Sequence, residues 1–161
     1  AIGEYIEEEM GHQEWVLNDI EACGGNKESV RNSATEADAP CHATELMVAY
    51  AYDMINRVNP VGFFGMVLVL EGTSTAVATQ AGEKIMQALK LPKKAFSYLF
   101  SHGSLDISHV SFYESLMNQV TRPEDQEIII HAAKRFYRLY GDIFNHVAAQ
   151  VANRQLTAAA A

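Results

Sequence analysis

The sequence is poor in cysteine and in basic residues, and each shortage excludes a class of protein. Only Cys23 and Cys41 occur in 161 residues, and neither belongs to a CxxC pattern. A disulfide-stapled fold is therefore excluded, and a reducing compartment is favoured. Twelve Lys and Arg against 20 Asp and Glu give a net charge of −8. This balance argues against nucleic acid or an anionic membrane as a partner.

The chain also lacks a long hydrophobic run. Its longest charge-free apolar stretch covers residues 61–70 and ends at Glu71, well short of the ~20 residues of a spanning helix. No basic leader precedes an apolar segment at Ala1, so we expect a cytoplasmic protein. The sequence starts without Met in what reads as a helix, and we expect N-terminal helices to be missing. A hydrophobic fraction of 48% is enough for a globular core.

The hydrophobic pattern predicts an all-α fold, a single helical-bundle domain over residues 1–161, because strand-like alternation of Val and Ile is absent. Five helices are expected, with residues 26–40 as a connecting loop. The third should be a buried central helix, since residues 61–70 are apolar on all sides. Their expected ranges are about 2–23, 44–59, 60–91, 93–120 and 121 toward the C-terminus.

Local signals set these boundaries. Gly24 follows the first helix as a C-terminal stop, and Thr44 is the expected N-cap of the second. The patch from Gly72 to Thr75 is expected to kink the third helix, and the fourth is expected to be irregular near Gly103. Residues 121–124, Thr-Arg-Pro-Glu, predict a capping box at the start of the fifth helix.

Three side chains of the fourth predicted helix have ligand chemistry and share one stripe. His102, Asp106 and His109 are spaced by four and three residues, which places them on the same helix face. Imidazole and carboxylate groups that converge in this way suit a first-row metal such as iron. A lone histidine is more often structural, and His42, His131 and His146 are interpreted in that way.

Two other helices supply further candidates. Glu9 and His12 form the Glu-x-x-His pair that di-metal carboxylate bundles use, although Glu8 is equally well spaced to be the ligand. Glu71 is the only charged residue between Val61 and Gly82, and a buried lone carboxylate needs a cation or hydrogen bonds. A hydrogen bond to Thr75 is the simpler alternative. Taken together, three helices with such residues favour a metal site.

These residues carry a resemblance to a known family. The chain resembles the heme-oxygenase-like diiron oxidases and oxygenases, including the CADD-like para-aminobenzoate synthases and the fatty-acid decarboxylases that make 1-undecene. The His-x3-Asp-x2-His element is the most specific match, and Glu-x2-His and Leu-Glu-Gly occur in the same order. The matching stretches are residues 8–15 (EEMGHQEW), 59–60 (NP), 70–74 (LEGTS) and 102–109 (HGSLDISH).

The resemblance implies a heme-oxygenase-like helical bundle with two Fe(II) ions, Mn being an alternative, and O2 as co-substrate. It makes six residues the candidate ligands, with Glu9, His12 and His102 favouring one iron, Asp106 and His109 the other, and Glu71 as a bridge. The set is Glu9, His12, Glu71, His102, Asp106 and His109.

Two departures from the family pattern bear on the site. Some members have a carboxylate seven residues before the histidine, where this chain has Tyr5. Members also carry further helices ahead of this point. In the para-aminobenzoate synthases a tyrosine of the protein is consumed, and Tyr5 and Tyr113 are the candidates for such a role here.

The leading hypothesis is an O2-activating diiron oxidase or oxygenase for a small organic substrate, of amino acid or fatty acid type, or for its own side chain. One alternative is a metal-free, TenA-like hydrolase with a nucleophilic cysteine. It is disfavoured because Cys23 lies at a helix C-terminus, where the helix dipole opposes a thiolate. Another is a helical interaction protein with a vestigial metal site. A homodimer is an open alternative.

Overall fold

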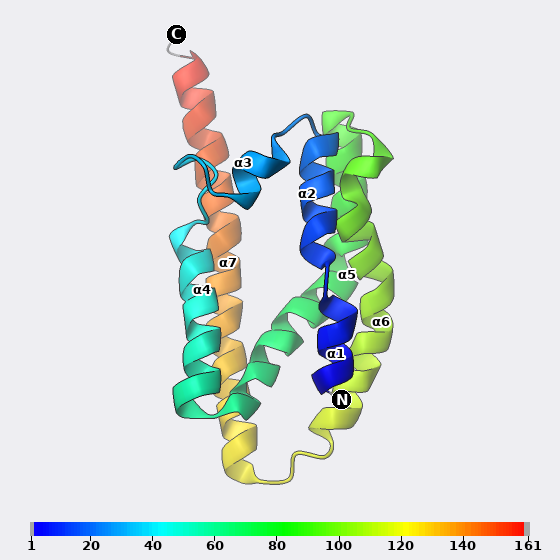
Figure 1. Cartoon of the computed structure of the whole chain (residues 1–161), viewed down its shortest axis with the longest axis vertical. Coiled ribbons are helices and arrows are strands. Elements are labelled where there is room, and N and C mark those ends of the chain that lie inside the picture. The colour runs from blue at the N-terminus through cyan, green and yellow to red at the C-terminus, as the bar shows by residue number, and fades with distance from the viewer. Residues whose placement is uncertain (1, 160–161) are drawn as a thin grey trace. The chain divides into compact units, whose positions relative to one another are not determined.

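The computed structural model describes the backbone of residues 2–159 and the side chains of residue 3, residues 5–102 and residues 109–157. Within this range the chain forms helices and no strand, which confirms the all-α prediction (Figure 1). Short π- and 3-10-helical segments join some of the α-helices: η1 (Met54–Val58), η2 (Pro60–Phe63) and η3 (Lys93–Phe96). The α-helices are α1 (Ile2–Glu9), α2 (His12–Ala22), α3 (Lys27–Arg31), α4 (His42–Asp53), α5 (Phe64–Leu89), α6 (Ser97–Met117) and α7 (Pro123–Ala159).

The helices form two compact units, each built from two stretches of chain. The first unit contains Ala1–Ala39 and Glu71–Phe112, and the second contains Pro40–Leu70 and Tyr113–Ala161. Helices α5 and α6 each contribute to both units. All the candidate ligands belong to the first unit. The prediction of one domain stays a prediction.

The sequence predicts one N-terminal helix, but the structure has two. The segment is divided into α1 and α2, with Gly11 between them at a φ of 95°. This left-handed conformation is available to glycine at little cost, since glycine has no Cβ. The predicted stop is confirmed, because α2 ends at Ala22 and Gly24 has a φ of 87°. The predicted loop contains the short helix α3, whose first N–H groups are capped by the side chain of Asn26.

Two further boundaries also differ. Helix α4 begins at His42, with Cys41 rather than Thr44 as N-cap. Helix α7 begins at Pro123, and the predicted capping box does not form in this described segment, because the Glu124 carboxylate accepts from the guanidinium of Arg122 instead.

Two predictions concern irregularities within helices. Helix α6 runs through Gly103 without the predicted break in the described backbone. The kink predicted at residues 72–75 stays a prediction: α5 is continuous there, and Ser74 and Thr75 donate hydrogen bonds to the backbone carbonyl of Glu71, contacts that often bend a helix.

The core of the second unit lies where α4, α5 and α7 meet. Met54, Val69 and Phe136 are almost completely buried there, and the ring of Tyr50 packs against Phe136. Gly65 allows α5 to approach α7 closely, since a Cβ on it would lie 2.5 Å from Ala133 N and 2.7 Å from Ile129 O. These distances leave no room for a side chain, so Gly65 fixes the contact between the two helices.

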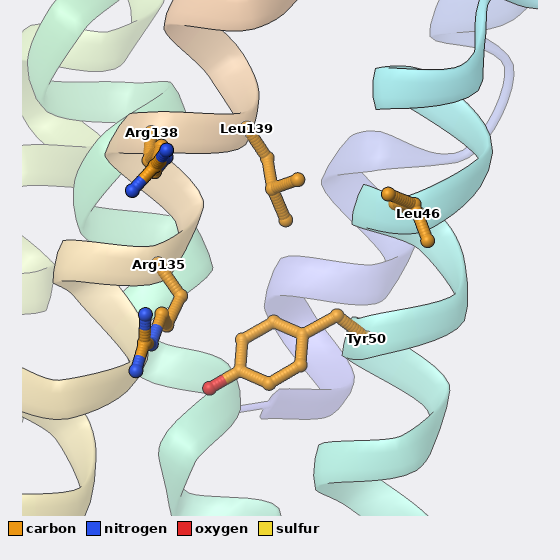
Figure 2. A pocket seen from close by; sticks show the side chains of 5 residues that line it. All are labelled: Leu46, Tyr50, Arg135, Arg138 and Leu139. Carbon is orange, nitrogen blue, oxygen red and sulfur yellow. The ribbon is translucent and has the colours of Figure 1, made fainter.

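A pocket of about 310 Å³ opens between α4 and α7 in the second unit (Figure 2). Leu46 and Leu139 form apolar walls, and the hydroxyl of Tyr50 is buried without a hydrogen-bond partner in the described structure. Arg135 and Arg138 line the same pocket from α7.

The segment Pro60–Leu89 is long and apolar enough to cross a membrane by length and composition alone, since its 18 most apolar consecutive residues have a mean hydropathy of 1.6. The core helix of a globular protein meets the same criterion. Val67, Val69, Glu71 and Ala78 of this segment are all buried in the structure, and a carboxylate in mid-helix is costly in lipid. The sequence predicts burial on all sides, but only 33% of these 18 residues are buried, and Leu68 and Val77 are exposed. The helix is therefore buried on part of its surface only.

Replacing Gly65 by alanine tests the close approach of α5 and α7. Because the new methyl group would overlap the α7 backbone, Gly65→Ala should lower the free energy of unfolding by about 1–3 kcal/mol. Gly141→Ala is the matched control, since Gly141 lies within α7 and nothing lies within 4 Å of the position that its methyl group would take. That variant should gain up to about 1 kcal/mol from helix propensity. Equilibrium denaturation measures both, and equal stabilities would contradict the packing.

Candidate metal centre

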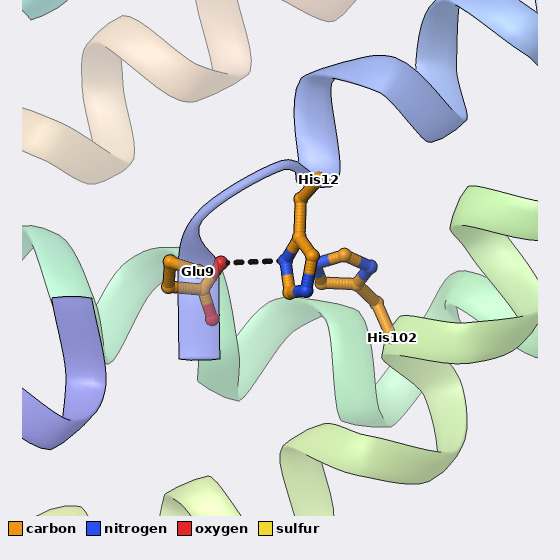
Figure 3. A group of neighbouring side chains, drawn as sticks. All are labelled: Glu9, His12 and His102. Carbon is orange, nitrogen blue, oxygen red and sulfur yellow. Dashed lines mark hydrogen bonds and ion pairs between the residues drawn. The ribbon is translucent and has the colours of Figure 1, made fainter. Parts of the chain in front are cut away.

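Glu9 and His12 lie on either side of the break between α1 and α2. Glu9 is the last residue of α1 and His12 the first of α2. Glu9 Oε2 lies 2.8 Å from His12 Nδ1. The left-handed Gly11 produces the turn that brings the two side chains together. Figure 3 shows the contact at the break.

His102 completes the first group from α6. It is buried, with 7% of its surface exposed, and its ring lies edge-on to that of His12 at 4.8 Å (Figure 3). Trp15 stacks on His12 at 4.2 Å. His102 Nδ1 lies 3.0 Å from the backbone carbonyl oxygen of Tyr98. Because a carbonyl only accepts, Nδ1 carries the hydrogen and Nε2 keeps its lone pair for a ligand.

Asp19 fixes the start of α6 against α2. Its Oδ1 accepts hydrogen bonds from the N–H and the hydroxyl of Ser97, at 3.0 and 2.5 Å, and its Oδ2 accepts from the N–H of Tyr98 at 2.9 Å. A carboxylate at this end satisfies free N–H groups and interacts favourably with the helix dipole. The contact therefore holds His102, one turn further along, at a defined position relative to α2.

A second group combines Glu71, His109 and again Glu9. His109 Nδ1 lies 3.3 Å from Glu71 Oε2 and 3.7 Å from Glu9 Oε1. Only 5% of Glu71 is exposed. The hydroxyl of Tyr5 donates to Glu71 Oε1 at 2.8 Å. A hydroxyl does satisfy one oxygen of this carboxylate, as the alternative interpretation expects, but the donor is Tyr5 rather than Thr75, whose hydroxyl donates to the backbone carbonyl of Glu71.

The two groups have the spacing of metal-ligand sets and share one carboxylate. One ligand atom from each of Glu9, His12 and His102 lies within 4.8 Å of the others, and so does one from each of Glu9, Glu71 and His109. Glu9 Oε1 is buried and has no hydrogen-bond partner in the described structure. An unsatisfied carboxylate oxygen beside a second carboxylate is expensive unless a cation lies there. Mixed imidazole and carboxylate donors suit Fe(II) or Mn(II), so the residues fit such ions.

Five of the six residues predicted from the sequence lie in these two groups: Glu9, His12, Glu71, His102 and His109. The sixth, Asp106, lies on α6, but its side chain is outside the described residues. The residue common to both groups is Glu9, whereas the family resemblance favours Glu71 as the bridge. His42, His131 and His146 are exposed.

Some positioning residues had no sequence signal. Asp19 and Ser97 are 78 residues apart, and nothing in either segment indicates the other. The family resemblance indicates Tyr5 as the position of a carboxylate in some members and as a candidate reactive tyrosine. Its hydrogen bond to Glu71 depends on the fold.

The remaining reactive candidates are not part of the two groups. Cys23 is the exposed C-cap of α2, about 16 Å of helix rise from His12. A hydrogen bond with Thr44 lowers the pKa of Cys41. Tyr113 packs edge-on against Phe64 in the second unit, and burial raises its pKa to about 12. Both Cys41 and Tyr113 belong to the second unit, whereas the ligand groups belong to the first.

Comparison with known proteins shows the family to which the chain belongs. The model of the family described as "iron-containing redox enzyme" matches residues 1–141. The chain belongs to this family. Neither curated proteins nor solved structures gave a match. Family membership confirms the heme-oxygenase-like resemblance and supports an iron-dependent oxidoreductase, and the two groups are candidates for holding the iron.

Removing the Asp19 carboxylate tests how α6 is positioned. Asp19→Ala leaves N–H groups at the start of α6 without their acceptor, so the free energy of unfolding should fall by about 0.5–2 kcal/mol. Glu83→Ala is the control, because Glu83 is an exposed acid on α5 in the same unit and should change stability by less than about 0.5 kcal/mol. Thermal or denaturant unfolding measures the difference, and an unaltered Asp19→Ala variant would refute the capping role.

Proposed function

We propose that the protein is a non-heme diiron oxidase or oxygenase that uses O2 on a small organic substrate, of amino acid or fatty acid type, or on one of its own side chains. The observation that supports this best is the shared carboxylate of Glu9. Its Oε2 belongs with His12 and its Oε1, buried and without a hydrogen-bond partner, faces His109. A carboxylate whose two oxygens face different histidines can bind two adjacent cations, one through each oxygen.

Two Fe(II) ions bound here, with Mn(II) as the alternative, would supply the electrons and the Lewis acidity for O2 chemistry. The residues supply position and dryness. His12 and His102 present ring nitrogens, and Trp15 covers one face of His12. Asp106 would join the second set, as the family resemblance implies. The low exposure of Glu71 and His102 limits access of water, which protects an oxidising site from side reactions.

Space for an organic substrate exists in the same unit. A pocket of about 600 Å³ lies between α2 and the η3–α6 segment. Its Tyr98 ring packs against the His102 ring, with centroids 4.1 Å apart. The pocket is therefore one side chain away from the first ligand group. Its walls are mostly apolar and include Val16, Ile20, Ala95, Phe96, Tyr98 and Leu99, which favours a substrate with an apolar part.

The setting of this activity is part of the proposal. The net charge of −8 supports a small-molecule partner rather than nucleic acid or an anionic membrane. The two unpaired cysteines support a cytoplasmic location. A homodimer remains a proposal to be tested by solution mass.

Metal stoichiometry tests the proposal. Protein reconstituted anaerobically with Fe(II) should hold close to two ions per chain. Glu9→Ala should lower the occupancy of both, because Glu9 is common to the two groups, whereas His102→Ala and His109→Ala should each mainly lower one. Iron analysis after desalting, repeated with Mn(II), measures the ratios.

His131→Ala is the matched control, since His131 is exposed on α7 and should leave the stoichiometry unchanged. Retention of two ions after loss of Glu71, His102 and His109 together would refute the site. O2 uptake by the reduced, iron-loaded protein separates an oxidase from an interaction protein. A loaded protein that never consumes O2 with candidate amino acids or fatty acids would refute the activity.

A further inference from the structure

Two side chains of α1 contact the outward-facing atoms of the second ligand group. We propose that Glu8 and Tyr5 are positioning residues that orient His109 and Glu71 for the second metal ion. The inference rests on the proposed function, since it concerns how one of the two ions is held. Neither residue belongs to the two ligand groups found in the described structure.

The imidazole of His109 lies between carboxylates on two sides. Its Nδ1 faces Glu71 Oε2 at 3.3 Å and Glu9 Oε1 at 3.7 Å, and its Nε2 lies 3.3 Å from Glu8 Oε2. One ring nitrogen thus points into the ligand group and the other points out of it. Without a cation, Nδ1 can donate its hydrogen to Glu71 Oε2. A bound cation would require the other tautomer, in which Nε2 carries the hydrogen toward Glu8 and Nδ1 presents its lone pair to the cation. A carboxylate behind a ligating histidine fixes its tautomer and ring orientation in this manner.

Exposure separates Glu8 from the ligands. The side chain of Glu8 is 58% exposed, against 29% for Glu9 and 6% for Glu71. Glu8 therefore keeps much of its hydration and needs no cation to offset burial. Spacing alone left both Glu8 and Glu9 as candidates for the ligand, and the family resemblance favours Glu9. The geometry points to Glu9 as the ligand and Glu8 as the residue behind His109.

Tyr5 acts on Glu71 in a parallel way. Its hydroxyl donates to Glu71 Oε1 at 2.8 Å, which leaves Oε2 directed at His109. The Tyr5 ring also lies edge-on to the His109 ring at 6.2 Å. Tyr5 and Glu8 are three residues apart and so share one face of α1. Through these two contacts, the short helix α1 positions Glu71 and His109. The third member of the second group, Glu9, is itself the last residue of α1.

The test is a metal titration with Co(II) alone, followed by its visible absorption under anaerobic conditions. In Glu8→Gln, the second equivalent should bind about 10–100-fold more weakly, the range for loss of an outer carboxylate partner, while the first stays within about twofold. Tyr5→Phe should weaken the same equivalent. Glu8→Asp should restore most of the affinity. Glu7→Gln is the matched control, because Glu7 is the exposed neighbour on α1.

The outcomes separate this inference from the function on which it rests. Wild-type protein that binds fewer than two Co(II) ions would overturn both. Wild-type protein that binds two ions, with Glu8→Gln and Tyr5→Phe indistinguishable from it, would overturn the positioning role alone. Complete loss of the second ion at saturating Co(II) in both Glu8→Gln and Glu8→Asp would make Glu8 a ligand, and would also overturn it. A changed absorption band with two ions retained in Glu8→Gln supports the role.

Discussion

Burial of carboxylates is the constraint on which the first unit depends. Glu71 is almost inaccessible to water, and one oxygen of Glu9 is buried beside it. Desolvation and mutual repulsion both oppose two ionised carboxylates at this separation. Tyr5, His12 and His109 offset part of the cost through the contacts they make with the carboxylates. The desolvation cost of Glu9 Oε1 stays uncompensated, because this oxygen has no hydrogen-bond partner in the described structure. Glu9 belongs to both ligand groups, and a divalent cation bound there would offset the cost.

The burial of these carboxylates accounts for part of the acidic composition. A net charge of −8 first reads as a statement about solubility and about partners that are excluded. Part of it is internal, because Glu9 and Glu71 belong to the ligand groups. Two divalent cations would offset half of the formal charge. Most of the net negative charge still lies outside the two groups, because only two of the 20 acidic residues belong to them.

The geometry of the centre depends on contacts that are remote in sequence. A left-handed glycine at position 11 divides α1 from α2 and turns Glu9 toward His12. Asp19 caps the start of α6, and the carbonyl of Tyr98 then sets the tautomer of His102. Each contact uses ordinary hydrogen bonding. Together they explain how imidazole and carboxylate groups from α1, α2, α5 and α6 meet.

The sequence by itself determined the helical class and the residues with ligand chemistry. It also predicted a central helix buried on all sides, which the structure buries only in part. Helical periodicity and the spacing of His102 and His109 are local properties, and a lone Glu71 in an apolar run is visible without coordinates. It did not determine the break at Gly11, because Gly within a helical pattern signals a cost rather than a conformation. Spacing to His12 also could not choose between Glu8 and Glu9, and only the family resemblance favours Glu9.

Tertiary structure decided those points, since they depend on which groups from distant segments share one buried volume. It made Glu9, rather than Glu71, common to both ligand groups, and set Tyr5 and Glu8 behind them. Spacing along a helix fixes which side chains share a face, whereas burial and hydrogen-bond partners are fixed only when helices pack.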